Sequence, residues 1–111
     1  MKKTLLILSI ALLLPATSVL AHFGVILPSD DIVTQGDNRT LDLQVKFIHP
    51  AEGQYMQMAR PQRFEVLRDG KAENLLPALT AKSFKAENKN SDLTYWFTAY
   101  QIRRPGDHTF F

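Results

Sequence analysis

The alternation of apolar and polar residues at positions 41–47 constrains the fold of this chain more than any other feature. Apolar residues occupy every second position: Leu41, Leu43, Val45 and Phe47. The positions between them are polar: Asp42, Gln44 and Lys46. Because successive side chains of a strand point to opposite faces, this pattern predicts a β-strand with one face in a hydrophobic core.

Weaker strand patterns recur along the rest of the chain, with turn-forming residues between them. Strands are predicted at residues 23–27, 32–34, 63–67, 80–84, 93–102 and 109–111. Asp69-Gly70 predicts a tight hairpin turn after the third of these. Residues 75–85 contain Pro77 and are predicted to be a loop and a short strand instead of a helix. The expected fold is all-β, an immunoglobulin-like antiparallel β-sandwich.

The two ends of the chain suggest how the domain is delimited. Lys2 and Lys3 precede a short apolar run at residues 5–14, and small residues lead up to Ala21. This run is shorter than the roughly 20 residues of a membrane-spanning helix, so residues 1–21 are predicted to be a signal peptide. The mature chain, residues 22–111, is then expected in the periplasm.

The last predicted strand of the mature chain ends on Phe110 and Phe111 without a turn, which predicts a sandwich truncated at the C-terminus.

Charge and cysteine content exclude several classes of partner. The precursor has a formal net charge of +2, and removal of Lys2 and Lys3 brings this to zero. Without a clustered basic excess, nucleic-acid binding is not expected. The chain has no cysteine, hence no disulfide and no site for lipid attachment. We therefore expect a mature chain that is not embedded in a membrane.

His22 is the first candidate metal ligand. Cleavage after Ala21 would leave a free α-amine beside the His22 imidazole. These groups titrate near pH values of about 8 and about 6.5, so both can offer a lone pair at neutral pH. Nitrogen ligands suit nickel, cobalt, copper and zinc. The alternative is that His22 belongs to a frayed, solvated terminus.

Other candidate ligands lie further along the chain. His49 has the same parity as Leu41 and Val45, so its side chain is predicted to extend the apolar face just before Pro50. It is either a second metal ligand or a hydrogen-bonded histidine at the core edge. Met56 and Met58 could bind copper(I), although packing is the commoner use of such residues. His108, in Pro105-Gly106-Asp107-His108, stands where a sandwich often has its corner tyrosine, which predicts a structural role.

Catalytic signatures are lacking in the sequence. There is no cysteine nucleophile, no Gly-x-Ser-x-Gly elbow and no Gly-rich phosphate loop. Asp30-Asp31 is an adjacent carboxylate pair, and neighbours in a turn normally face different directions. We therefore expect no enzymatic activity.

Four short motifs resemble those of one known family: Ala21-His22-Phe23-Gly24, Phe47-Ile48-His49-Pro50, Met56-Gln57-Met58-Ala59-Arg60-Pro61 and Pro105-Gly106-Asp107-His108. This is a periplasmic domain family of uncharacterised function that is described as the periplasmic component of ABC-type cobalt and nickel transport, also called nickel-transport NikM-like. The resemblance spans His22 to Phe111. It implies an immunoglobulin-type sandwich that continues beyond the end of this sequence, with His22 and His49 as the matching ligand positions.

These observations lead to one preferred function and two alternatives. We expect a periplasmic module that binds nickel or cobalt, with copper also fitting the ligands, and that hands the metal to a membrane transporter. The first alternative is a structural or protein-interaction sandwich of the cell envelope without a metal role, whose edge strands recruit a partner. The second is a copper enzyme with an N-terminal histidine brace, which would need a second histidine facing the first.

Overall fold

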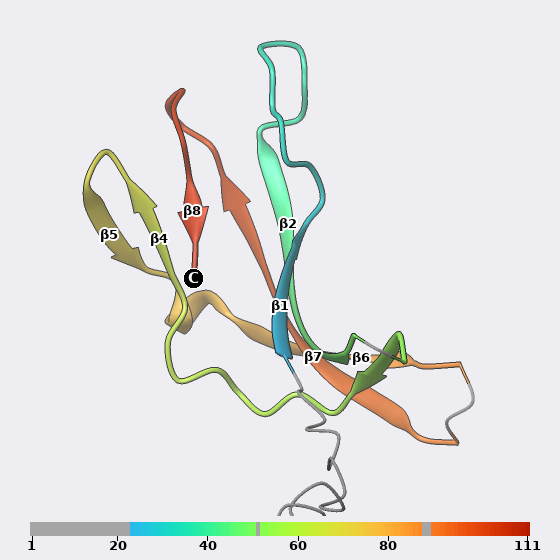
Figure 1. Cartoon of the computed structure of the whole chain (residues 1–111). Coiled ribbons are helices and arrows are strands. Elements are labelled where there is room, and N and C mark those ends of the chain that lie inside the picture. Colours follow the sequence, from blue (N-terminus) through green and yellow to red (C-terminus); the bar gives the residue numbers. More distant parts are fainter. Residues whose placement is uncertain (1–22, 51, 88–89) are drawn as a thin grey trace, which may run out of the picture.

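The protein folds into two antiparallel β-sheets (Figure 1). The computed structural model describes residues 23–50, 52–87 and 90–111. Its elements are β1 (Phe23–Pro28), β2 (Thr40–His49), β3 (Gln54–Met56), β4 (Glu65–Arg68), β5 (Lys71–Asn74), the 3-10 turn η1 (Leu76–Ala78), β6 (Thr80–Lys85), β7 (Asp92–Gln101) and β8 (Thr109–Phe110). The larger sheet has the order β1-β2-β7-β6 with β3 also paired to β2, and the smaller sheet has the order β5-β4-β8. The predicted all-β, sandwich-like fold is confirmed.

The hydrophobic core lies between the two sheets. From the larger sheet, Leu41, Leu43 and Val45 of β2 are buried, together with Tyr100 of β7. From the side of the smaller sheet come Phe64 and Val66, each only 1% exposed. Of the four residues predicted to form the apolar face of β2, Leu41, Leu43 and Val45 are buried, because packing against the second sheet removes them from water. The fourth, Phe47, is half-buried.

The hairpin between β4 and β5 turns at Asp69 and Gly70, as predicted. Their φ angles are +51° and +71°, which is the left-handed conformation that a two-residue type I′ turn requires at both positions. The strand that follows, β5, was not predicted. All four of its residues are exposed, so its sequence carries no alternation of apolar and polar residues.

Two further predictions need correction. Residues 32–34 form no strand. The Asp37 carboxylate instead accepts hydrogen bonds from the Thr34 backbone N–H at 2.7 Å and from the Thr34 hydroxyl at 2.6 Å. These bonds lower the pKa of Asp37, and the first of them occupies a backbone N–H that a strand would need for its ladder. The short strand β3 was also missed, since three residues are too few for a visible pattern.

Candidate metal site

His49 occupies the end of β2 and is the predicted ligand that the structure places. Its side chain is 6% exposed and both ring nitrogens are shielded from solvent. This confirms the predicted inward orientation. The turn after β2 is closed by hydrogen bonds from the Glu52 N–H to the His49 carbonyl, at 3.2 Å, and from the Gly53 N–H to the Pro50 carbonyl, at 3.3 Å. The backbone of His49 is thus held by β2 on one side and by this turn on the other.

His22 and the whole predicted signal peptide lie outside the described residues, so their roles remain predictions. The first described residue is Phe23, which opens β1 and has Ile48 of β2 as its Cα partner. Ile48 is the residue before His49. β1 therefore begins at the end of β2 where His49 lies.

The two methionines occupy different surroundings. Met56 of β3 has Phe47 as its Cα partner, while Gln54 is the partner of His49. Met56 therefore shares a face with His49 as its diagonal neighbour across the strands, a relation that typically separates two residues by about 7–8 Å. Met58 instead packs against the hydrophobic core, which is the packing role expected for it.

The acidic residues do not complete a metal site in the part of the chain that the structure describes. No group of three or more His, Cys, Asp or Glu side chains gathers there in a way that could hold a metal ion.

His108 is engaged in a hydrogen-bond network before β8. Its Nδ1 lies 3.0 Å from the Tyr100 hydroxyl and its Nε2 lies 3.3 Å from the Arg104 carbonyl. A carbonyl can only accept, so Nε2 carries the proton and Nδ1 accepts from the hydroxyl. The Tyr100 ring also packs edge-to-face on the rings of His108 and Phe110. These contacts fit the structural role expected for His108.

Tyr100 links this network to the core. It is 7% exposed, and this burial raises the pKa of its hydroxyl, although Arg68 nearby opposes the shift. The unfolded chain therefore ionises this hydroxyl first, and the corresponding stability is present below pH about 10 and lost as the pH rises further.

We expect Tyr100→Phe to lower the free energy of unfolding by about 0.5–1.5 kcal/mol, because the ring is kept and one hydrogen bond is lost. The variant should also lose less stability than the native protein between pH 9 and 11, a range set around the usual tyrosine pKa of about 10. Urea unfolding at each pH gives both values. Tyr95→Phe is the matched control, since no hydrogen bond of the Tyr95 hydroxyl is found among the described residues. Equal losses in the two variants would contradict the role of the Tyr100–His108 bond.

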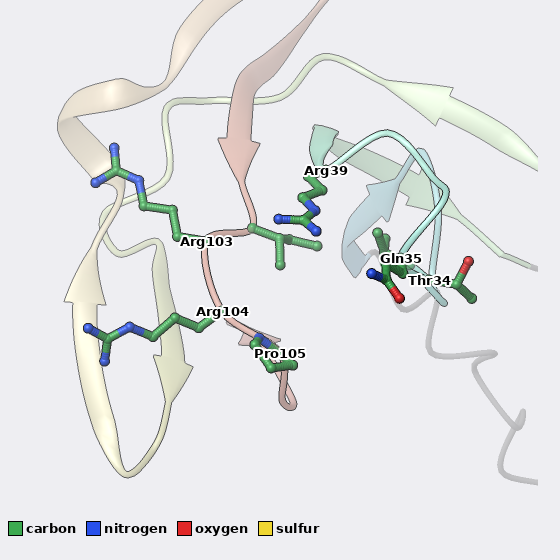
Figure 2. Close-up of a pocket in the computed structure, with 8 residues that line it drawn as sticks. Thr34, Gln35, Arg39, Arg103, Arg104 and Pro105 are labelled. Atoms are coloured by element: carbon green, nitrogen blue, oxygen red, sulfur yellow. The ribbon is translucent and has the colours of Figure 1, made fainter.

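Arginines gather around a separate hollow of about 340 Å³, formed mainly by residues 33–35 and 102–105. Figure 2 shows that the side chains of Arg103 and Arg104 extend to one side, away from Arg39. The three guanidinium groups therefore do not converge on one point. This hollow is not built as an anion site.

The part of the chain that the structure describes contains no helix with the length and apolar character needed to span a membrane.

Comparison with known proteins places the chain in a family. Neither a curated protein nor a solved structure matches the chain significantly. One family model, a domain of unknown function (DUF4198), matches residues 19–111 and so includes every strand described above. The chain therefore belongs to the DUF4198 family.

Proposed function

We propose that the protein is a periplasmic module that binds a divalent transition metal, with the His22 amine, the His22 imidazole and the His49 imidazole as ligands. The observation that carries this proposal is the register of β1 on β2. Phe23 is paired with Ile48, and one further step of the same register would oppose residue 22 to His49. Directly opposed residues have Cβ atoms about 4.5–5.5 Å apart, which is close enough for two imidazoles to share one metal ion.

The ligand types determine which metals are suitable. Three nitrogen ligands suit nickel, cobalt and copper, and the resemblance described above names nickel and cobalt. Met56, on the same face as His49, adds a soft thioether that favours copper(I) over the harder divalent ions. Delivery to a membrane metal transporter is part of the same proposal and rests on the resemblance alone.

Metal binding should depend on processing after Ala21. We expect the mature chain that starts at His22 to bind nickel, cobalt or copper, and to bind more weakly as the pH falls, because protons compete for the amine and imidazole nitrogens. One extra residue before His22 turns its amine into a peptide nitrogen and should lower the affinity by about tenfold or more. Loss of one ligand in His49→Ala should lower it by about tenfold. Isothermal titration calorimetry measures these affinities.

The control for this experiment is His108→Ala, which removes a histidine that has hydrogen-bond partners elsewhere in the fold. Its metal affinity should equal that of the mature native chain, once circular dichroism has shown that it is folded. Equal affinity in all four proteins would place the metal elsewhere. Mass spectrometry of the exported protein tests the first step, and any mature N-terminus other than His22 would remove the amine ligand.

A second candidate function is protein interaction through β1. Within the described residues β1 pairs only with β2, so its other edge is open. The strand carries no charged residue, and Phe23 and Leu27 are 52% and 39% exposed. Open, uncharged edges can accept a strand from a partner. A mature chain that binds no metal but forms dimers in analytical ultracentrifugation would favour this function over the first.

A further inference from the structure

Lys46 of β2 lies in an aromatic cage on the face of the larger sheet that points away from the core. Its ammonium nitrogen is 4.9 Å from the ring centre of Tyr55, 4.7 Å from that of Phe84 and 5.0 Å from that of Tyr95. Lys46 and His49 are three positions apart in one strand, so their side chains leave opposite faces of the sheet. The cage is therefore separate from the candidate metal site.

The cage is built by side chains of four different strands. Lys46 comes from β2, Tyr55 from β3, Phe84 from β6 and Tyr95 from β7. Phe84 stands edge-to-face against Tyr55 and against Tyr95, with 5.5 Å between ring centres in each pair. In Figure 1 this end of the sheet, with β3 and β6, extends away from the β4–β5 hairpin. The rings thus hold the ammonium group in place before any ligand arrives, which reduces the entropy lost on binding.

The ammonium group of Lys46 retains its capacity to donate. It has three N–H donors and no acceptor. Among the described residues no carboxylate oxygen lies within 4.0 Å of it, and no hydrogen bond of its nitrogen is present. A half-buried cation without a counter-ion binds an anionic oxygen more strongly than a fully solvated one does.

A hollow of about 400 Å³ adjoins the cage. Its lining includes Lys46, Tyr55 and Phe84 from the cage, and Glu52 and Glu87 at the surrounding turns. This volume lies within the range of sites for small molecules. The hollow is also lined by Lys85, so it combines aromatic rings, two ammonium groups, of which that of Lys46 is held by the cage, and two carboxylates that can accept hydrogen bonds from hydroxyl groups.

A second lysine ammonium group lies over an aromatic ring beside the cage. The Lys82 nitrogen of β6 lies 3.7 Å from the ring centre of Phe97. Lys82 is the Cα partner of Tyr95, which belongs to the cage. Ammonium groups and aromatic rings consequently alternate across β2, β7 and β6 on this face.

We propose that the hollow beside Lys46 binds a carboxylated six-membered sugar ring, that is, a hexuronate. The Lys46 ammonium pairs with the sugar carboxylate, and the Tyr55 ring packs against the apolar C–H face of the sugar. The Phe84 ring, which stands at 88° to that of Tyr55, contacts the edge of the sugar. The carboxylates of Glu52 and Glu87 accept hydrogen bonds from sugar hydroxyls. Lys82 and Phe97 offer the same pair of groups to the next residue of a longer acidic saccharide.

The test is a titration of the 15N-labelled mature chain with D-glucuronate, followed by NMR in the presence of a chelator. D-Glucose, which has the ring without the carboxylate, and acetate, which has the carboxylate without the ring, are the comparison ligands. We expect D-glucuronate to shift the amide signals of β2, β3 and β6, and to bind about tenfold or more tightly than either comparison ligand. Equal binding of glucose or of acetate would overturn the proposal.

Variants locate the binding site. Lys46→Met keeps the length of the side chain and removes its charge, so its affinity for D-glucuronate should fall to the level measured for D-glucose. Lys71→Met, in the exposed strand β5 of the other sheet, should bind as the native chain does. An unchanged affinity in Lys46→Met would overturn the proposal. A failure of the metal-binding prediction would not overturn this result, because the titration contains a chelator and the Lys46 and His49 side chains leave opposite faces of β2.

Discussion

Phe64→Ala is expected to remove most of the stability of the domain. Phe64 is 1% exposed and is among the largest fully buried side chains in the described part of the chain. It lies in the core between the two sheets, next to β4. Truncating a buried phenylalanine costs about 3–5 kcal/mol through lost burial and the cavity that remains. A small domain has a total stability near the low end of about 5–15 kcal/mol, so the variant should be partly unfolded at 25 °C.

Urea unfolding followed by the fluorescence of Trp96, the single tryptophan, measures this change. Phe23→Ala is the matched control, because Phe23 is 52% exposed and its truncation should cost less than about 1 kcal/mol. The slope of the free energy of unfolding against urea concentration should be the same in the native protein and the control. A cost below about 1.5 kcal/mol for Phe64→Ala would show that the side chain is not enclosed between the sheets.

Leu43→Ala should have the second largest effect, a loss of about 2–5 kcal/mol in the free energy of unfolding. Leu43 is 0% exposed. It sits in the middle of β2, between Pro28 of β1 and Thr98 of β7. Because interiors are close-packed, the neighbours can fill only part of the space that the missing side chain leaves.

The same substitution at an exposed leucine tests whether burial or strand propensity explains the loss of stability in Leu43→Ala. Leu67 lies in β4 and is 41% exposed. Leu67→Ala removes the same atoms from a strand and should cost less than about 1 kcal/mol. If both variants lost the same stability in thermal and urea unfolding, strand propensity and not burial in the core would explain the effect of Leu43→Ala.

Part of the candidate metal site could be predicted from the sequence. The inward orientation of His49 follows from its parity with the apolar residues of β2, and the structure confirms it with an exposure of 6%. The relation of Met56 to His49 could not be predicted. It depends on β3, whose pairing places Met56 opposite Phe47, and three residues are too few to show a period.

No pattern in the sequence predicts the aromatic cage around Lys46. Lys46 occupies one of the polar positions of the alternating pattern and was expected only to face away from the core. Its three rings come from β3, β6 and β7. Only the order of the strands in the sheet brings them together, because contacts between distant segments are set by pairing and not by local pattern.

The sequence by itself determined the fold class, the buried face of β2 and the turn at Asp69-Gly70, because alternation and left-handed turn residues act within a few positions of the chain. Only the tertiary structure decided that β3 and β5 are strands, that residues 32–34 are not, and which side chains meet on each face of the larger sheet. Those outcomes depend on competition for backbone hydrogen bonds. In residues 32–34 the side chains of Asp30 and Asp37 accept the backbone N–H groups of Ile32 and Thr34. In β3 and β5 a neighbouring strand satisfies the backbone groups instead.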